Sequence, residues 1–151
     1  MEVFDPQKAA GVWQRVQGGA TQSRPEEGLL ELIAREAEDA EIYLQLSRKL
    51  QGKAGVLLRK MYEQELAHAA CLRGIYTLTT GKRAGAVTPK LTPDTPEHIL
   101  RRCYGREMRC LARYEQRVGD PEYGPVFQRL AEQERAHCHM ILELLGGLLT
   151  K

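Results

Sequence analysis

Two glutamate–histidine pairs, Glu65-x-x-His68 and Glu134-x-x-His137, are the residues of this 151-residue chain best suited to do chemistry. Residues three apart share one face of an α-helix and lie about 4.5 Å apart along its axis, so each pair can reach one metal site. Carboxylate oxygens and imidazole nitrogens are ligands of divalent metals such as iron, manganese and zinc. The two pairs therefore predict metal binding on a helix face.

The two pairs belong to an internal repeat. The hexapeptides that end at His68 and at the second histidine match in five of six positions, at an offset of about 69 residues. The segments before them match more loosely: Glu36 has Tyr43 seven residues later, and Glu107 has Tyr114 seven residues later. The repeat predicts a duplicated helical hairpin in which each helix contributes one glutamate.

Each of these four glutamates falls within the apolar stripe of its predicted helix. A buried carboxylate without a partner loses much of its solvation energy, and four together repel one another. No Lys or Arg lies near them on those stripes, so ion pairs do not explain the arrangement. Two divalent cations would balance the four charges, and the two imidazoles would complete the coordination, as in known di-iron and di-manganese bundles.

The elements that must position these residues are long segments with apolar residues at helical spacing. They cover residues 25–50, 54–80, 96–118 and 121–149. Thr95 and Asp120, each followed by a proline, are typical of helix starts, and alternation typical of strands does not persist anywhere. A shorter helix with Val12, Trp13 and Val16 on one side is expected to cover one end of the bundle.

The lengths of the connections constrain how the helices are ordered. The first and second helices, and the third and fourth, are joined by few residues, so each pair is expected to be an antiparallel hairpin. The stretch from Gly81 to Pro96 has no helical pattern and is long for a compact domain. One long crossover between two hairpins is typical of the ferritin-like four-helix bundle, with an ordinary up-down bundle and a loose loop as the alternative. The expected organisation is an N-terminal helix and linker over residues 1–24 and the bundle over residues 25–151.

On Glu36 with Tyr43, Glu107 with Tyr114, and the two Glu-x-x-His pairs, residues 25–149 resemble the rubrerythrin-like diiron domain of the ferritin-like superfamily. The resemblance implies an all-α, ferritin-like four-helix bundle that holds two iron ions, with manganese or zinc as alternatives. It further implies a homodimer. In this family pattern Glu65 and Glu134 would bridge the metals. The terminal ligands would be Glu36, Glu107, His68 and His137.

The chain also departs from that family. Rubrerythrins usually add a rubredoxin-like iron site built from two CxxC pairs, and this sequence has none. The resemblance therefore implies an external electron donor, such as a rubredoxin-like protein. Cys110 stands where the family often has a further glutamate, three residues after Glu107. Asp39 occupies the matching place three residues after Glu36. Its role is open: it is a ligand, a hydrogen-bond acceptor beside the ligands, or a carboxylate that is solvated or orients a histidine.

Three other residues have two open interpretations each. Tyr43 and Tyr114 either hydrogen-bond to the ligand carboxylates or are core aromatics with satisfied hydroxyls. Cys110 is expected to pack in the core, although it is close enough to the predicted site to be oxidised there. His98 and His139 are expected on the surface.

The overall composition restricts the class of protein. The chain is 42% hydrophobic and 28% charged with a formal charge of +2, which is typical of a soluble globular domain and gives no strong attraction to nucleic acid or membrane. No long apolar run or leader pattern is present, so a cytoplasmic protein is expected. With four glutamates internal, 22 basic residues face 16 acidic ones, a balance of +6, and an acidic redox partner fits that exterior.

Four functions fit the predicted site. The first is an oxidoreductase that reduces hydrogen peroxide or O₂ at a carboxylate-bridged metal pair, and the family resemblance favours peroxide. The second is iron handling, in which ferroxidase action is coupled to binding or storage. The third is hydroxylation of an organic substrate, and the fourth is a metal site that only stabilises the fold.

Overall fold

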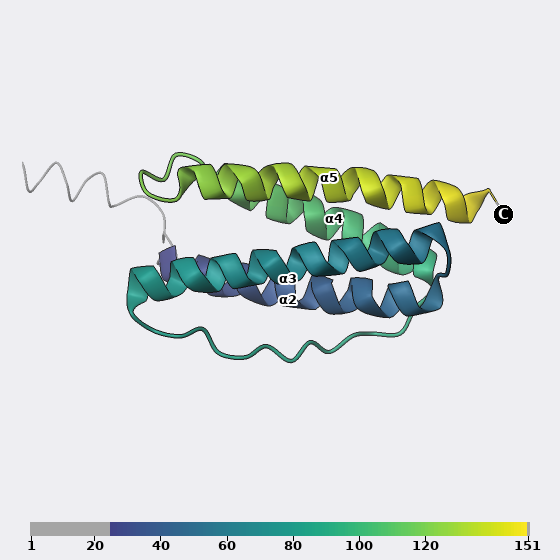
Figure 1. The fold of residues 1–151 in the computed structure, drawn as a ribbon, viewed down its shortest axis with the longest axis horizontal. Helices are drawn as coiled ribbons and strands as arrows, with labels where there is room; N and C mark the ends of the chain where they lie inside the picture. Colours follow the sequence, from purple (N-terminus) through teal and green to yellow (C-terminus); the bar gives the residue numbers. More distant parts are fainter. Residues whose placement is uncertain (1–24, 151) are drawn as a thin grey trace, which may run out of the picture.

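A computed structural model describes residues 25–150 as a bundle of four helices. They are α2 (Pro25–Lys49), α3 (Lys53–Thr80), α4 (Pro96–Glu115) and α5 (Gly124–Leu149), and no strand occurs among the described residues (Figure 1). The prediction of an all-α four-helix bundle is confirmed. The predicted helix with Val12, Trp13 and Val16 lies outside the described residues.

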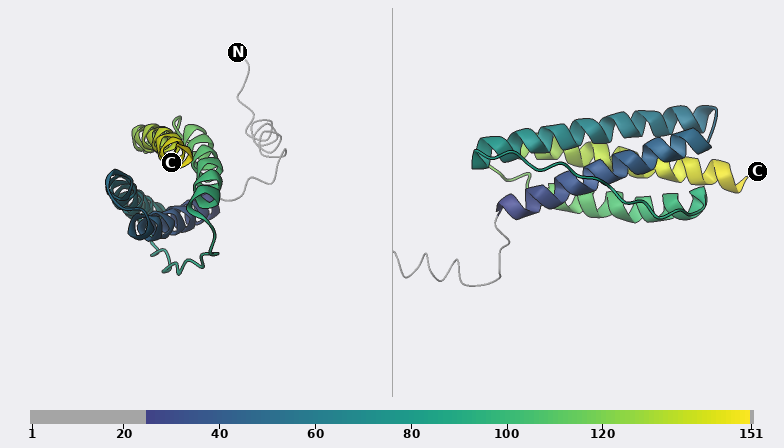
Figure 2. Two further views of the ribbon diagram at one scale, coloured as in Figure 1. Left: turned by 90° about the vertical axis from the view of Figure 1, so that its right-hand side faces the viewer. Right: turned by 90° about the horizontal axis from the view of Figure 1, so that it is seen from below.

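The order of the helices is that of two packed hairpins. Helix α2 packs mainly against α3, and α4 against α5, while α2–α4 and α3–α5 contacts join the hairpins. Residues 81–95 run along the outside of the bundle from one end to the other, so that α3 and α4 run in the same direction (Figures 1 and 2). The ferritin-like order is confirmed, and the alternative of an ordinary up-down bundle is wrong.

The two predicted helix starts have different outcomes. Thr95 adopts an extended backbone and its side-chain oxygen accepts a hydrogen bond from His98 N at 3.3 Å, which caps α4. The prediction that Asp120 begins the last helix is wrong, because α5 starts at Gly124. The Asp120 carboxylate instead accepts from the backbone N–H groups of Glu122 and Tyr123, at 2.9 and 2.7 Å, and so stabilises the preceding turn.

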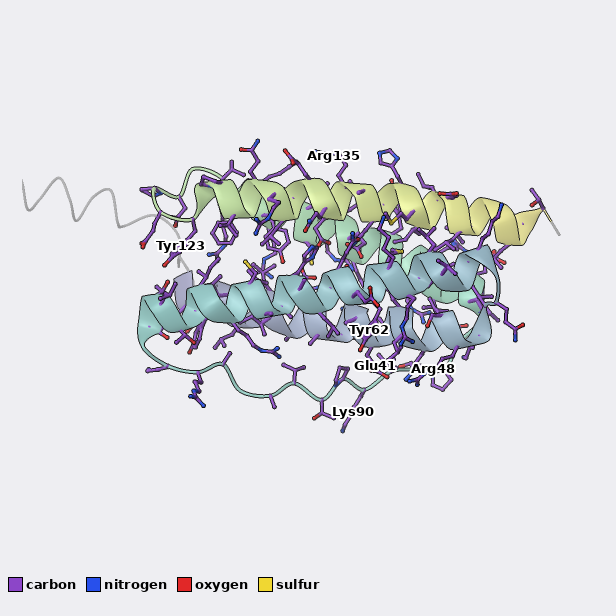
Figure 3. The ribbon with its side chains drawn as sticks, in the orientation of Figure 1. Glu41, Arg48, Tyr62, Lys90, Tyr123 and Arg135 are labelled. Atoms are coloured by element: carbon purple, nitrogen blue, oxygen red, sulfur yellow. The ribbon has the colours of Figure 1, made fainter. Side chains whose placement is uncertain are left out.

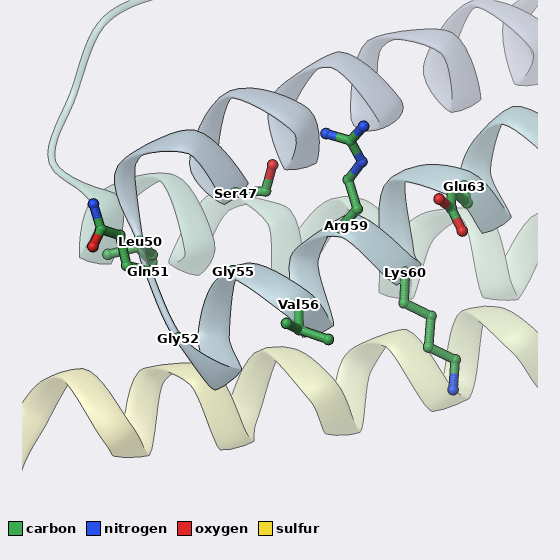
Figure 4. Close-up of a pocket in the computed structure, with 9 residues that line it drawn as sticks. All are labelled: Ser47, Leu50, Gln51, Gly52, Gly55, Val56, Arg59, Lys60 and Glu63. Carbon is green, nitrogen blue, oxygen red and sulfur yellow. The ribbon is translucent and has the colours of Figure 1, made fainter.

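Two glycines make the short connection between α2 and α3 possible. Gly52 has φ +70°, a conformation that residues with side chains rarely adopt. A Cβ atom on Gly55 would lie 2.3 Å from the carbonyl oxygen of Leu50. Figure 4 shows both glycines at this turn, beside a hollow of about 620 Å³ that Ser47 and Arg59 also line. The turn sets the antiparallel register of the first hairpin.

The core consists of two apolar clusters with an ionisable layer between them. On every helix the glutamate that the sequence singled out lies between residues of the first cluster and residues of the second. The first cluster includes Leu29, Leu32, Ile33, Leu72, Ile75, Leu111, Phe127 and Leu130. The second includes Leu46, Leu58, Met61, Leu100, Cys103, Ile141 and Leu144. Apolar packing on both sides therefore holds the four carboxylates at the same level of the bundle.

Candidate metal centre

The six predicted ligands converge in the layer between the two apolar clusters. The four glutamates and His137 have no exposed surface, and His68 is 2% exposed. Their donor atoms form two groups, in each of which all atoms lie within 4.8 Å of one another. One group is Glu36, Glu65, His68 and Glu134, and the other is Glu65, Glu107, Glu134 and His137. Glu65 and Glu134 belong to both groups, which is the geometry required of bridging carboxylates.

The duplicated hairpins place equivalent atoms around an approximate two-fold relationship. His68 Nδ1 lies 2.8 Å from Glu134 Oε1, and His137 Nδ1 lies 2.7 Å from Glu65 Oε1, so each imidazole faces a glutamate of the other hairpin. The two imidazole rings stack with centroids 5.7 Å apart. The repeat in the sequence thus becomes a repeat in space.

The donor set fits a pair of metal ions. Eight buried oxygen and nitrogen atoms of these residues have no hydrogen-bond partner within residues 25–150. They are Glu36 Oε2, both carboxylate oxygens of Glu65 and of Glu134, Glu107 Oε2, and the Nδ1 atoms of His68 and His137. Buried polar atoms are nearly always hydrogen-bonded in folded proteins, so eight such atoms facing one another require another explanation. Coordination of two divalent cations would supply it and would balance four ionised carboxylates.

The electrostatics of the metal-free cluster divide the glutamates into two pairs. Burial raises the pKa of Glu65 and of Glu134 well above the usual glutamate range, and repulsion from Glu36 raises both further. Burial also acts on Glu36 and Glu107, but hydrogen bonds and the neighbouring imidazoles outweigh it and lower their pKa values, that of Glu107 to about 2. The shared carboxylates therefore keep their protons until a cation replaces them.

Tyr43 and Tyr114 hydrogen-bond to the glutamates in a crossed manner. The hydroxyl of Tyr43, on α2, donates to Glu107 Oε1 on α4, and that of Tyr114, on α4, donates to Glu36 Oε1 on α2. Both hydroxyls are buried, and burial raises the pKa of each tyrosine, with the nearby glutamate raising it further, so both stay protonated donors. The structure places both tyrosines in contact with glutamates of the cluster, each on the opposite hairpin.

Two glutamines beside the cluster were not among the predicted site residues. His68 Nε2 lies 2.6 Å from Gln133 Oε1, and His137 Nε2 lies 2.7 Å from Gln64 Oε1, distances at which the ring N–H donates to the amide oxygen. In a neutral imidazole a proton on Nε2 leaves Nδ1 as the atom that can bind a metal, and in both residues Nδ1 faces the glutamates. The signal was present in the sequence, because both glutamines occupy the same position of the repeated hexapeptide.

Asp39 lies beside the cluster but belongs to neither donor group. It is 1% exposed, and its Oδ1 accepts a hydrogen bond from Arg106 Nε at 2.5 Å. Burial raises the pKa of Asp39 to about 8, attraction to Arg106 opposes that shift, and repulsion from Glu107 adds to it. Asp39 is therefore an acceptor for an arginine of α4, and the interpretation of a solvated carboxylate is wrong.

Cys110 is fully buried within the first apolar cluster. Burial raises the pKa of its thiol, and the charge of Glu36 raises it further, so the thiol stays protonated. All four of Cys71, Cys103, Cys110 and Cys138 are free. His98 and His139 are exposed, in agreement with the expectation.

Comparison with known protein families gives one result for this chain. The family model described as Rubrerythrin matches residues 27–145, a range that includes all six predicted ligands. A comparison with curated proteins gives no match. None of the helices in residues 25–150 has the length and apolar character needed to cross a membrane. The match covers most of the chain, and it coincides with a buried cluster of glutamates and histidines suited to metal binding. The chain belongs to the rubrerythrin family.

Proposed function

We propose that this protein is a non-haem diiron oxidoreductase that reduces hydrogen peroxide or O₂ and is re-reduced by an external donor. The observation that carries the proposal is the pair of donor groups that share Glu65 and Glu134. Glu36 and His68 would complete the ligands of one metal, and Glu107 and His137 those of the other. Membership of the rubrerythrin family supports iron as the metal and peroxide as the preferred oxidant.

Two adjacent iron ions supply one electron each, which is what the two-electron reduction of a peroxide bond needs. The protein contributes a site from which water is largely excluded, because the six ligands are almost completely buried. Gln64 and Gln133 hold the imidazoles in the tautomer that offers Nδ1. Tyr43 and Tyr114 fix the orientation of Glu107 and Glu36. Each hydroxyl donates to the Oε1 atom of its glutamate, which leaves Oε2 facing the cluster.

Reduction of the site requires a partner, for which we propose an acidic electron-transfer protein such as a rubredoxin-like protein. Two observations support this choice. The chain contains no CxxC pair that could form a rubredoxin-like centre of its own. With the four glutamates of the cluster buried, the remaining charged residues carry a net positive charge, which attracts acidic partners.

The test is anaerobic loading with Fe(II) followed by separate challenges with hydrogen peroxide and with air. Wild-type protein is expected to bind two irons per chain and to be oxidised rapidly by peroxide and slowly by air, followed by absorbance in a stopped-flow experiment. Glu134→Gln should bind less iron and lose the rapid phase. Glu132→Gln is the matched control, because Glu132 is exposed on the same helix two residues away.

Other outcomes would replace the proposal. Rapid oxidation by air with retention of many irons per chain would identify iron storage instead. Binding of two metals with no oxidation faster than that of free Fe(II) would identify a structural site. If Glu134→Gln and wild type take up iron equally, the cluster is not the metal site.

A further inference from the structure

A second cavity lies outside the metal centre, between the crossover and the bundle. It has a volume of about 850 Å³ and is lined by residues of α2, of α4 and of residues 88–93 in the crossover. Figure 2 shows the crossover passing over this side of the bundle, and Figure 3 shows Glu41 of α2 and Lys90 of the crossover on the same side. The volume is in the range of pockets that hold small organic molecules.

Most charged residues that line this cavity are basic. They are Lys49, Lys90, Arg101, Arg102, Arg106 and Arg109, against Glu38 and Glu41. Two of the six are engaged: Arg102 pairs with Asp94 at 2.6 Å, and Arg106 with Asp39 and Glu38. Within residues 25–150, no acidic group lies within ion-pair distance of the other four. The cavity therefore has unbalanced positive charge.

The wall of the cavity also holds an unsatisfied donor. Arg106 Nη2 is buried and has no hydrogen-bond partner, although it lies 3.3 Å from Glu38 Oε2. Buried guanidinium N–H groups normally find acceptors, so the guanidinium of Arg106, although paired with Asp39, is not fully satisfied.

Part of the lining is apolar. Ile42 and Leu46 of α2, Ile99 and Cys103 of α4, and Leu91 of the crossover all line the cavity. Leu46 and Cys103 are each 1% exposed, so they form a floor, whereas Arg101 and Arg109 are exposed at the rim. An inorganic anion would leave this floor uncovered, and a neutral apolar molecule would leave the cations unused.

We propose that this cavity binds a small organic anion, namely a carboxylate or sulfonate attached to an apolar body. The apolar body packs on Ile42, Leu46 and Ile99, and the anionic group is held by the arginines of α4. The binding does not depend on metal in the bundle, because none of the six predicted metal ligands lines the cavity.

The test uses 8-anilinonaphthalene-1-sulfonate, which has an aromatic body and one sulfonate and fluoresces more strongly when it leaves water. The expected result is saturable binding with one site per chain on the full-length protein. Decanoate should displace the probe, whereas decyltrimethylammonium and inorganic phosphate should not. If inorganic phosphate displaces the probe, the cavity is a simple anion site. If decyltrimethylammonium displaces the probe as well as decanoate does, the binding is apolar without charge recognition. Either result overturns the proposal.

Variants locate the binding. Arg101→Gln and Arg109→Gln should each weaken binding about tenfold, the size of one hydrogen bond between charged groups, and both sites are exposed, so folding should be unaffected. Ile42→Trp should cover part of the apolar floor and weaken binding, with circular dichroism checking the fold. Arg129→Gln is the control, because Arg129 is exposed on α5 and does not line the cavity. Unchanged binding in all three cavity variants places the probe elsewhere and overturns the proposal.

Discussion

At the scale of single residues, the imidazoles depend on their hydrogen-bond partners for the orientation that the cluster needs. Each ring has Nδ1 within 3 Å of a shared glutamate oxygen, 2.8 Å for His68 and 2.7 Å for His137. The opposite nitrogen contacts a glutamine of the other hairpin. A ring held at Nε2 offers its Nδ1 lone pair in a fixed direction.

Removing one glutamine should therefore weaken metal binding without removing a ligand. Gln133→Leu is expected to lower the affinity for Zn²⁺ by about 10- to 100-fold, because His68 loses the contact that fixes its tautomer and ring orientation. A competition titration against a chelator measures the change. Gln128→Leu is the control, since Gln128 is exposed on the same helix. Equal affinity in Gln133→Leu and wild type would show that the glutamine has no orienting role.

How far these residues could be predicted depended on whether a local pattern fixes their position. The Glu-x-x-His spacing places both groups of a pair on one helix face, and four matching stripes imply one shared layer, so the convergence of the six residues was predictable. The partners of Tyr43 and Tyr114 were not, because each donates across to the other hairpin and that pairing depends on how the hairpins pack. The glutamines were visible in the repeat, but their role depends on the same packing.

At the scale of helices, Asp39 and Arg106 form a buried contact between α2 and α4. These two helices belong to different hairpins and have few other contacts. Two other ion pairs join these helices, Glu38 with the same Arg106 and Glu31 with Arg113, and in each the glutamate is more exposed than Asp39. Among the ion pairs between α2 and α4 in the described part of the chain, the Asp39 contact is therefore the one most shielded from water.

Its contribution to stability should vary with pH in metal-free protein. Burial raises the pKa of Asp39 from 3.8 to about 8, so between these values the unfolded chain loses a proton that the folded chain keeps. The free energy of unfolding of wild type, relative to that of Asp39→Asn, should consequently be highest below about pH 4. This difference should fall as the pH rises toward about 8, by up to about 1.4 kcal/mol per pH unit.

Urea unfolding of both proteins at pH 5 and pH 8 tests this expectation. Glu31→Gln provides the control, because it removes an exposed carboxylate from the same pair of helices. A constant difference between wild type and Asp39→Asn at the two pH values would mean that Asp39 ionises normally in the folded protein.

Helix boundaries show what sequence patterns do and do not settle at this scale. Thr95 followed by a proline begins a helix, because its side chain reaches the free N–H of His98. Asp120 has the same local pattern but satisfies the N–H groups of a turn, and α5 begins at Gly124 with Pro125 in its first turn. The side chains of Thr95 and Asp120 both accept hydrogen bonds from backbone N–H groups that follow them. The local pattern is therefore the same whether a long helix follows or only one turn.

At the scale of the whole molecule, two hairpins meet across a layer of four carboxylates, and apolar clusters lie on either side of it. The crossover has no helix of its own, but its length lets α3 and α4 run in the same direction. The repeated Glu-x-x-His pairs lie on α3 and α5, and these two helices contact each other. The length of the crossover could not predict that residues 88–93 enclose a cavity with α2 and α4, because their position depends on tertiary contacts.

The stability of the whole bundle should therefore depend on metal. An ion that binds only the folded protein stabilises it by about 2.7 kcal/mol at one hundred times its Kd, which corresponds to a rise in Tm of several degrees for a domain of this size. Zn²⁺ is a suitable probe because it has no redox chemistry. Wild type should show this rise and lose it when a chelator is added.

Glu65→Gln separates coordination from general stabilisation. Without metal, this variant should be at least as stable as wild type at pH 8. Burial and three neighbouring glutamates raise the pKa of Glu65, so the folded wild type must hold a proton there that the unfolded chain has lost, and glutamine avoids this cost. With Zn²⁺ its Tm should rise much less than that of wild type, so the order of the two proteins reverses on metal addition. Glu63→Gln, at an exposed position on the same helix, should follow wild type in both states. An equal rise in Glu65→Gln and wild type would place the ion outside the carboxylate layer, whereas the reversal requires that the four glutamates repel one another until a cation lies between them.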